Sequence, residues 1–277
     1  AMGATTFAWF TITNTAKIQQ FEIEVTSAEG IELSVVDGVW GSTISGTVIE
    51  DLAGVSGAQL TAVTSDDGKT NFYTLVSLLE NGTYNATGAA AAGTDYVEFE
   101  IKVRSREQTK AIYIDPNATT IASAGVQWQP DTTFTIDGIL QITSGTAPFM
   151  VYARDSARMS FTGGDAAATT VIYEETAAGT SGMSSDWGKG ALNYFAAKNN
   201  YAAPQALNPG LSPYTVKEAG AAYNTVIVTT DTLGNEWSQA TITVRIWLEG
   251  WDAECYNAVF GDTLQIKIGF TTIDPTI

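Results

Sequence analysis

The clearest pattern in the chain is the alternation of apolar and polar residues with a period of two. In YVEFEIKVR, residues 96–104, the apolar side chains share one face of an extended strand and the charged side chains share the other. The same alternation marks residues 21–25, 241–248 and 264–270. Each of these segments is therefore predicted to be a half-buried β-strand.

Turn signals separate the alternating segments. In FTIDGILQI, Asp137-Gly138 can adopt the positive φ angles of a two-residue turn, which predicts a β-hairpin. Further turns are expected in EGIELSVVDGVW and in SDDGK. Many short strands with little helix are typical of layered β-proteins. We therefore predict an all-β fold, a jelly-roll or immunoglobulin-like β-sandwich.

The alternation fades between about residues 162 and 222, where Ala, Gly, Asn and Pro are frequent. Within this stretch, SDWGKGALNYFAAKNNY predicts one short helix. We interpret the stretch as a loop-rich insertion in a sandwich and not as a second domain. The predicted organisation is an N-terminal extended arm at 1–13, followed by a single β-sandwich domain at 14–277.

Composition narrows the class of protein. The 277 residues include 13 Lys and Arg against 30 Asp and Glu, and the resulting net charge of −17 disfavours nucleic acid and anionic lipid as partners. No apolar run approaches the roughly 18 residues that a membrane-spanning helix needs. Charged residues make up only 16% of the chain, and Thr, Ser, Gly and Ala are abundant, which is typical of exported β-proteins. We expect a secreted protein, extracellular or at the cell surface.

The chain contains no histidine, which removes the usual Ser-His-Asp and Cys-His nucleophiles and every zinc site that uses histidine. We therefore expect no enzymatic activity, no cofactor and no required metal. Cys255 is the single cysteine, so no disulfide can form within the chain. A buried small hydrophobe is the favoured interpretation, with a bridge between subunits or a reactive thiol as alternatives.

One segment, WLEGWDAEC, gathers acidic and aromatic residues: Trp247, Glu249, Trp251, Asp252 and Glu254. It could form a calcium loop or a sugar platform with the two indoles as stacking faces. The favoured interpretation is a strand end and a loop, with the tryptophans packed on the core and the carboxylates facing water. SDDGK is likewise explained by turn chemistry.

The N-terminal arm contains the uncharged stretch TTFAWFTIT, which has apolar groups on both faces. An extended apolar arm can pair with its own sheet or complete the sheet of another subunit, and both arrangements bury it. Apolar groups on both faces favour insertion between two layers. The candidate donor-strand residues are Thr5, Thr6, Phe7, Ala8, Trp9, Phe10, Thr11, Ile12 and Thr13.

Segments at both ends of the chain resemble one family. TTFAWFT and FEIEVTSAEGIELS near the start, with ITVRIWLEGWDAECYNA and LQIKIGF near the end, resemble the TasA and camelysin-like proteins of Gram-positive bacteria, which depend on a SipW-type signal peptidase. The resemblance does not cover the middle of the chain. It implies a jelly-roll-like subunit that polymerises into extracellular fibres of the biofilm matrix or cell surface. It also implies an N-terminal strand, carried over by position to Thr5–Thr13, that is donated to the neighbouring subunit.

Camelysin-type proteins are also described as metallopeptidases. This chain has no histidine to hold a zinc ion, so that activity is not carried over. The leading hypothesis is a structural subunit of an extracellular filament, a head-to-tail homopolymer whose partners are further copies and other matrix or cell-wall components. One alternative is a monomeric adhesin or carbohydrate-binding module that uses Trp128, Trp187, Trp247 or Trp251. Another is a secreted hydrolase with a carboxylate pair.

Overall fold

The computed structural model describes residues 16–26, 30–36, 38–48, 59–65, 67–74, 77–78, 84–85, 88–106, 109–136, 140–164, 169–175, 194, 197–198, 225–233, 237–250, 252 and 254–274. The candidate donor strand, Thr5–Thr13, lies outside the described residues, as do Trp187 and Trp251. Most of the predicted insertion also lies outside them.

Two sheets form the body of the described structure. The seven-stranded sheet contains β1 (Ala16–Val25), β4 (Thr43–Ile44), β5 (Gln59–Leu60), β12 (Ala111–Ile114), β13 (Thr120–Ser123), β20 (Val228–Thr229) and β23 (Thr263–Thr271). The ten-stranded sheet contains β2 (Ile31–Val36), β3 (Val39–Gly41), β6 (Ala62–Ser65), β7 (Phe72–Thr74), β10 (Gly88–Ala89), β11 (Val97–Ser105), β18 (Ala157–Gly163), β19 (Thr170–Glu174), β21 (Asp231–Leu233) and β22 (Trp237–Glu249).

Smaller elements complete the described part. Three two-stranded pairs are β8 (Ser77–Leu78) with β9 (Tyr84–Asn85), β14 (Val126–Trp128) with β17 (Phe149–Val151), and β15 (Phe134–Ile136) with β16 (Leu140–Ile142). The described helical elements include α2 (Ala153–Ser156) and the 3₁₀ helix η2 (Asn257–Gly261). No helix in these segments is long and apolar enough to cross a membrane. The predicted all-β, sandwich-like fold is confirmed.

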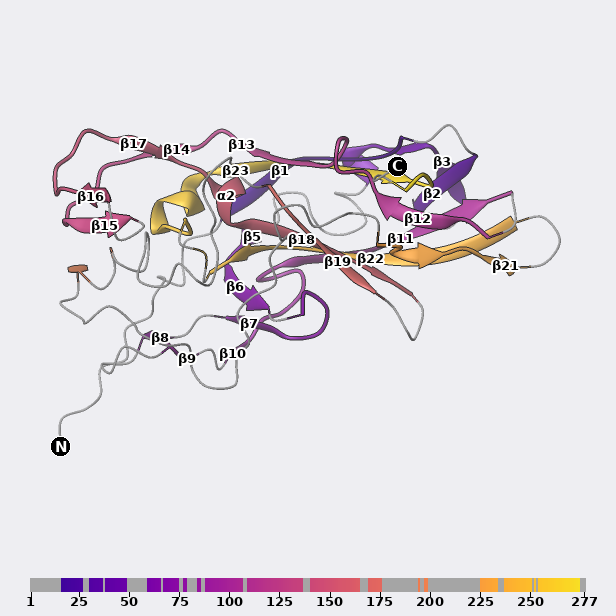
Figure 1. The fold of residues 1–277 in the computed structure, drawn as a ribbon, viewed down its shortest axis with the longest axis horizontal. Helices are drawn as coiled ribbons and strands as arrows, with labels where there is room; N and C mark the ends of the chain where they lie inside the picture. Colours follow the sequence, from indigo (N-terminus) through magenta and orange to yellow (C-terminus); the bar gives the residue numbers. More distant parts are fainter. Residues whose placement is uncertain are drawn as a thin grey trace.

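The core lies between the two sheets. Figure 1 shows β1, β23 and β13 in one layer and β18, β19, β22 and β11 in the other. Phe21 on β1 meets Phe99 on β11 edge to face, with ring centres 5.4 Å apart, and Phe161 on β18 meets Phe270 on β23 in the same way at 5.9 Å. Burial of these apolar faces removes them from water and is the main force that holds the layers together.

The predicted alternating strands are confirmed as β1, β11, β22 and β23. In β11, for example, the apolar residues face the core while Glu98 and Glu100 are exposed. Strand β22 pairs with β11 along one edge and with β18 along the other, so it lies inside its sheet. Toward its end both faces are buried, and the alternation stops there: Trp247, Leu248 and Glu249 are all fully buried.

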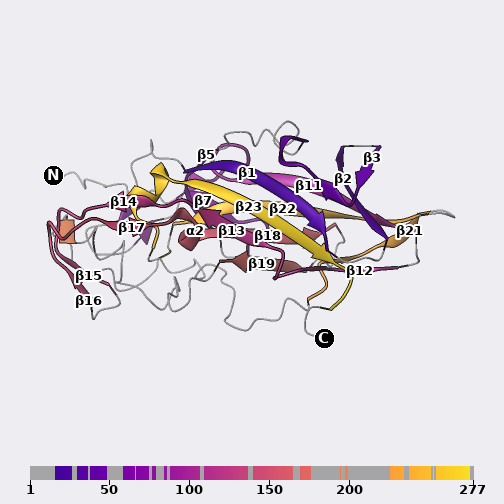
Figure 2. The same ribbon diagram turned by 90° about the horizontal axis from the view of Figure 1, so that it is seen from above.

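Strand β1 also lies inside its sheet. One edge pairs with β23 in parallel from Lys17 to Val25, and Figure 2 shows the two strands side by side and pointing the same way. The other edge pairs with β5 at Ala16 and Lys17 and with β4 at Ile23 and Glu24. An arm that folds back along β1 from Ala16 therefore meets occupied pairing positions at both ends of the strand.

The predicted turns are present. Val36 pairs with Val39, which leaves two residues in the β2–β3 turn, and Gly38 has a φ of +87°. The hairpin of β15 and β16 is confirmed, but its closing pair is Ile136 with Leu140. Three residues therefore separate the strands, whereas the prediction had two, and a three-residue loop is the next most common hairpin connection.

The sheet continues into the stretch predicted as an insertion. Strand β18 ends at Gly163, and β19 at 170–174 pairs with β18. Strand β19 was not predicted from the sequence. Of the predicted short helix, Tyr194, Ala197 and Lys198 are described and have helical geometry.

Candidate functional site

A shallow apolar groove, here called the edge groove, lies where β2, β3 and β4 meet. It encloses about 300 Å³. Its described lining residues are Leu33, Val35, Val39, Trp40, Gly41, Thr43, Ile44, Ser45 and Val48. None of these side chains is charged, although Asp, Glu, Lys and Arg together form 16% of the chain. The groove is thus suited to an uncharged, apolar occupant.

The edge groove forms where the chain passes from one sheet to the other. Strand β3 ends the ten-stranded sheet, β4 ends the seven-stranded sheet, and Ser42 alone connects them. Residues 46–48 form a short helical turn pressed against β1, where a Cβ at Gly46 would collide with the Phe21 carbonyl oxygen. This close approach holds Val48 at the groove. Val39 and Val48 remain 65% and 36% exposed, so both present aliphatic surface to solvent.

Next to the edge groove, one arginine lies over two indole rings. The guanidinium carbon of Arg104 is 4.2 Å from the ring centre of Trp40 and 3.9 Å from that of Trp237. Arg104 also donates to Glu32, with Nε 2.7 Å and Nη2 2.5 Å from the same carboxylate oxygen. These four residues come from β3, β11, β22 and β2 and form one layer on the outer face of the sheet. Because the four residues lie far apart in the sequence, no local motif predicts this layer.

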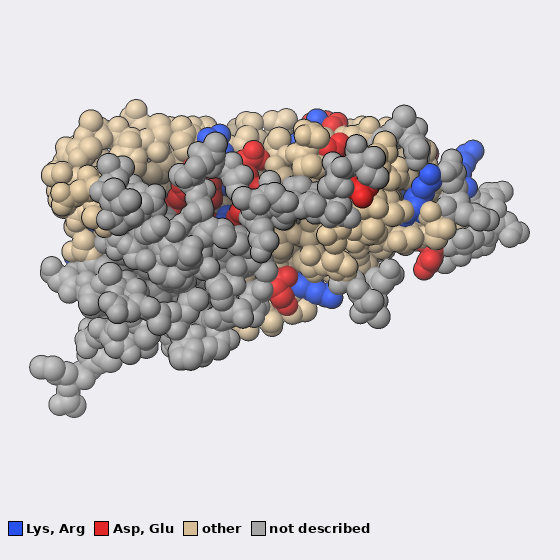
Figure 3. All heavy atoms as spheres, viewed as in Figure 1, with Lys and Arg blue, Asp and Glu red and all other residues tan. Residues whose placement is uncertain are grey.

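A second hollow, here called the end cavity, is lined in part by Glu32 and Trp237 of this layer and measures about 460 Å³. Its described lining residues are Val25, Gly30, Ile31, Glu32, Ser42, Arg106 and Trp237. The guanidinium carbon of Arg106 lies 4.9 Å from the centre of the Trp237 ring. Figure 3 shows basic side chains at the end of the molecule that carries β3 and β21. This end thus combines cationic groups with an aromatic wall.

The acidic and aromatic segment WLEGWDAEC differs from its favoured interpretation. Trp247 packs in the core as predicted and meets Phe72 edge to face at 5.3 Å. The carboxylates of Glu249 and Asp252, however, are 0% and 2% exposed, so the prediction that they face water is wrong. Asp252 pairs with a buried arginine, Arg158 on β18, and Glu249 accepts a hydrogen bond from the Trp247 indole N–H at 3.1 Å.

Arg158 is 1% exposed and is held by carboxylates and a carbonyl. Its Nε lies 2.8 Å from Glu174 Oε2, and its Nη2 lies 2.5 Å from Asp252 Oδ2. Its Nη1 donates to the Ala157 carbonyl oxygen at 3.2 Å. Burial alone would lower the pKa of this guanidinium, but Asp252, Glu174 and Glu249 raise it above its usual value. Arg158 therefore stays charged and offsets the buried acids.

Burial has the opposite effect on the acid that pairs with Arg158. It raises the pKa of Asp252 to about 6, although the Arg158 charge and the hydrogen bond from the Glu254 backbone N–H act to lower it. Cys255 lies beside this cluster, fully buried and free, and burial raises the pKa of its thiol. The prediction that Cys255 is a buried small hydrophobe is confirmed.

Two tryptophans proposed as sugar platforms are occupied by packing. Trp247 is fully buried, as described above. Trp128 contacts four aromatic rings, with ring centres 4.8 to 5.9 Å away: Phe134, Phe149, Tyr194 and Tyr256. Among the described tryptophans, Trp40 lines the uncharged edge groove, and Trp237 lines the end cavity beside Glu32 and Arg106. Trp187 and Trp251, the other tryptophans of the carbohydrate alternative, lie outside the described residues.

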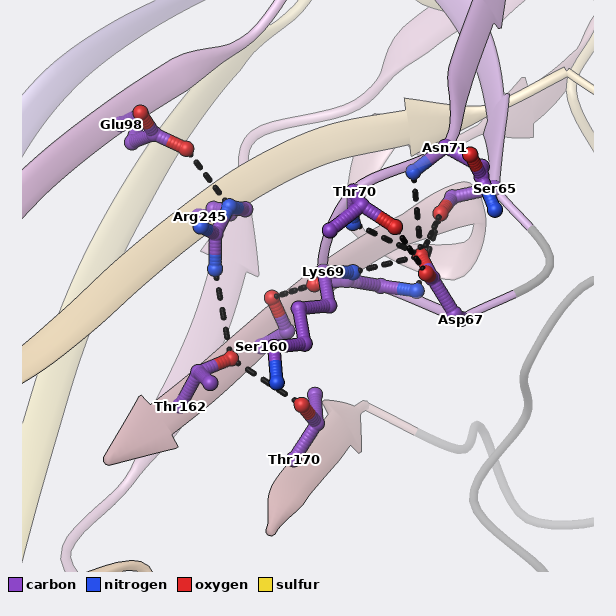
Figure 4. Close-up of polar contacts among 11 residues, drawn as sticks. Ser65, Asp67, Lys69, Thr70, Asn71, Glu98, Ser160, Thr162, Thr170 and Arg245 are labelled. Carbon is purple, nitrogen blue, oxygen red and sulfur yellow. Dashed lines mark hydrogen bonds and ion pairs between the residues drawn. The ribbon is translucent and has the colours of Figure 1, made fainter. Parts of the chain in front are cut away.

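SDDGK forms a turn ordered by one carboxylate, as predicted. Asp67 accepts hydrogen bonds from the backbone N–H groups of Lys69, Thr70 and Asn71 at 2.8 to 3.2 Å, and from the Thr70 hydroxyl at 2.5 Å. Figure 4 shows these contacts converging on the Asp67 carboxylate. Burial alone would raise its pKa, but these bonds outweigh burial and hold the pKa at about 2. Within the described segments, no group of three or more Asp, Glu or Cys is placed to bind a metal ion.

We predict that Arg158→Met lowers the free energy of unfolding by about 3–5 kcal/mol, because buried carboxylates lose their counter-charge. Lys267→Met is the matched control. It breaks the partly exposed pair in which Lys267 Nζ lies 2.9 Å from Glu24 Oε1, which solvent screens, so it should cost much less than the loss of Arg158. Urea unfolding followed by tryptophan fluorescence measures both. Equal costs for the two variants would contradict a compensating role for Arg158.

We also predict that Asp67→Asn destabilises the protein by about 1 kcal/mol at neutral pH, since a neutral amide is a weaker acceptor for the turn. The folded-state pKa of about 2 lies below the usual 3.8, so the contribution of Asp67 is complete above about pH 4. It should be lost as the pH falls from about 4 to 2. Unfolding curves of both proteins across this range provide the measurement, and a difference that does not change with pH would be inconsistent with this role.

No protein-family model, no curated protein sequence and no solved structure matches the chain. The function is therefore argued from the contacts, burial and charge of the described residues.

Proposed function

We propose that the protein is a structural subunit of an extracellular filament. Subunits join head to tail when residues Thr5–Thr13 of one copy enter the edge groove of the next. The observation that carries the proposal is the edge groove, whose described lining is uncharged, beside two strand edges that lack a described partner, in a chain whose N-terminal arm is itself apolar and uncharged.

The strand edges supply main-chain partners for an added strand. Among the described strands, β3 pairs only with β2, and β4 pairs only with β1. Each therefore has a second edge that lacks a described strand partner. An incoming strand can use such an edge for hydrogen bonds and place alternate side chains in the groove.

The pairing of β1 supports an occupant from another subunit. A hairpin in which the arm returns along β1 would compete with β5 at Ala16 and Lys17 and with β4 at Ile23 and Glu24. Insertion into a neighbour avoids this competition and buries apolar groups that would otherwise face water. A donor at one end and an acceptor elsewhere form a heterologous contact, which builds an open filament when its rotation does not close into a ring.

The test uses two full-length variants that disable opposite halves of the junction. Trp9→Asp places a charge on the arm, and Val39→Asp places a charge in the groove, where desolvating it costs several kcal/mol. Each variant alone should remain monomeric in size-exclusion chromatography. Mixed together, they should form 1:1 dimers and no filaments, because the intact arm of the Val39→Asp subunit fits the intact groove of the Trp9→Asp subunit.

Met150→Asp is the matched control, since Met150 on β17 is a strand residue of large apolar type that is 39% exposed and lies outside the groove. This variant should assemble like the unmodified protein under negative-stain microscopy. Circular dichroism melting of all three variants separates loss of assembly from loss of folding. Filaments from either groove or arm variant alone, or a mixture that stays monomeric, would sink the proposal.

A further inference from the structure

We infer that the end cavity binds a sugar that carries a carboxylate, such as a uronic acid unit of an acidic polysaccharide. The cavity of about 460 Å³ lies within the usual range of ligand pockets, about 300–1,000 Å³. This inference does not rest on the filament, because every residue that it uses belongs to one subunit.

Charge identifies the anionic part of the ligand. Among the described residues, two charged side chains line the cavity, Glu32 and Arg106. The Glu32 carboxylate is already held by two nitrogens of Arg104, which offsets its negative charge. Arg106 is exposed, and no ion pair joins it to a carboxylate among the described residues. Its guanidinium is a planar donor whose geometry matches a carboxylate.

The remaining lining residues fit a pyranose ring. Trp237 provides an aromatic wall of the kind that packs against apolar C–H groups, and Val25 and Ile31 extend this apolar surface. The Ser42 hydroxyl can donate to or accept from a sugar hydroxyl. An apolar wall with a few polar groups that fix orientation is the common composition of small-molecule sites.

The aromatic wall is held in place before any ligand binds. Arg104 lies over the Trp237 ring at 3.9 Å, and the neighbouring Ser238 pairs with Ser105 between β22 and β11. Arg106 follows directly after Ser105, so the strand register sets Arg106 opposite Trp237. Groups that are already positioned lose little conformational entropy on binding, which favours affinity for a small ligand.

The net charge of −17 opposes anionic ligands at long range. At physiological ionic strength this repulsion is screened beyond about 8 Å, whereas a direct contact with Arg106 is not. Because Arg106 provides a single charged contact, binding of one sugar unit should be weak. A polysaccharide that repeats the unit would gain from several sites acting together.

The experiment is a calorimetric titration of the full-length protein with trigalacturonic acid, alongside the neutral trisaccharide of galactose with the same linkage. We expect saturable binding of the acid and at least tenfold weaker binding of the neutral sugar. Arg106→Gln should weaken binding of the acid about tenfold or more, because a charge-assisted hydrogen bond is lost.

Arg154→Gln is the matched control, because Arg154 is also partly exposed and lies over an aromatic ring, with its guanidinium carbon 4.5 Å from the Tyr152 ring centre. Its affinity should equal that of the unmodified protein. Absence of binding by the unmodified protein, equal binding of the two sugars, or unchanged affinity in Arg106→Gln would each overturn the inference. Because heat is measured per subunit, these outcomes leave the filament proposal to its own test.

Discussion

The parallel pairing of β1 with β23 is the contact on which the arrangement of the sandwich depends. It joins the first and last described strands of the chain over most of their length and places β1 inside the sheet. The outer edge of β1 is then left to two short strands, β5 at its start and β4 at its end. This arrangement leaves no complete edge of β1 for the arm that precedes it, and it places the short edges of β3 and β4 beside an apolar groove. The β1–β23 pairing that orders the sandwich thus also leads to the strand edges at which assembly is proposed.

Acidic residues hold the loops of this sandwich, which has no internal disulfide. Asp67 orders its own turn, and Asp262, which is 4% exposed, accepts backbone hydrogen bonds from Gly125, Ala153 and Thr263 at 2.8 to 3.0 Å. Backbone N–H groups in buried loops need acceptors, and short carboxylates provide them where neither sheet nor helix does. Part of the net charge of −17 therefore serves the interior. The negative charge is thus not purely a surface property, because some carboxylates accept backbone hydrogen bonds in the loops.

The strand faces could be predicted from sequence because they depend on local alternation, as in β11 and β23. The inward turn of Asp252 could not, because it depends on Arg158, which lies 94 residues before Asp252 in the chain. The one available signal was an arginine within the otherwise small or apolar segment ARMSFT, a strand that is buried along its whole length. Similarly, Trp40, Arg104 and Trp237 meet only through strand order. Local context selected Trp128 and Trp247 instead, but Trp247 is buried in the core and Trp128 is partly buried against it.

The layer formed by Trp40, Arg104 and Trp237 contributes side chains to both proposed sites. Trp40 lines the edge groove, Trp237 lines the end cavity, and the Arg104 guanidinium contacts both rings. A strand seated in the groove would pack against Trp40 and so restrict the same layer that supports the cavity wall. In a head-to-tail filament each junction would then carry one sugar site at its side, repeated once per subunit. A polysaccharide chain that reaches several of these sites would gain from multivalent contact, the condition under which a weak single site becomes effective.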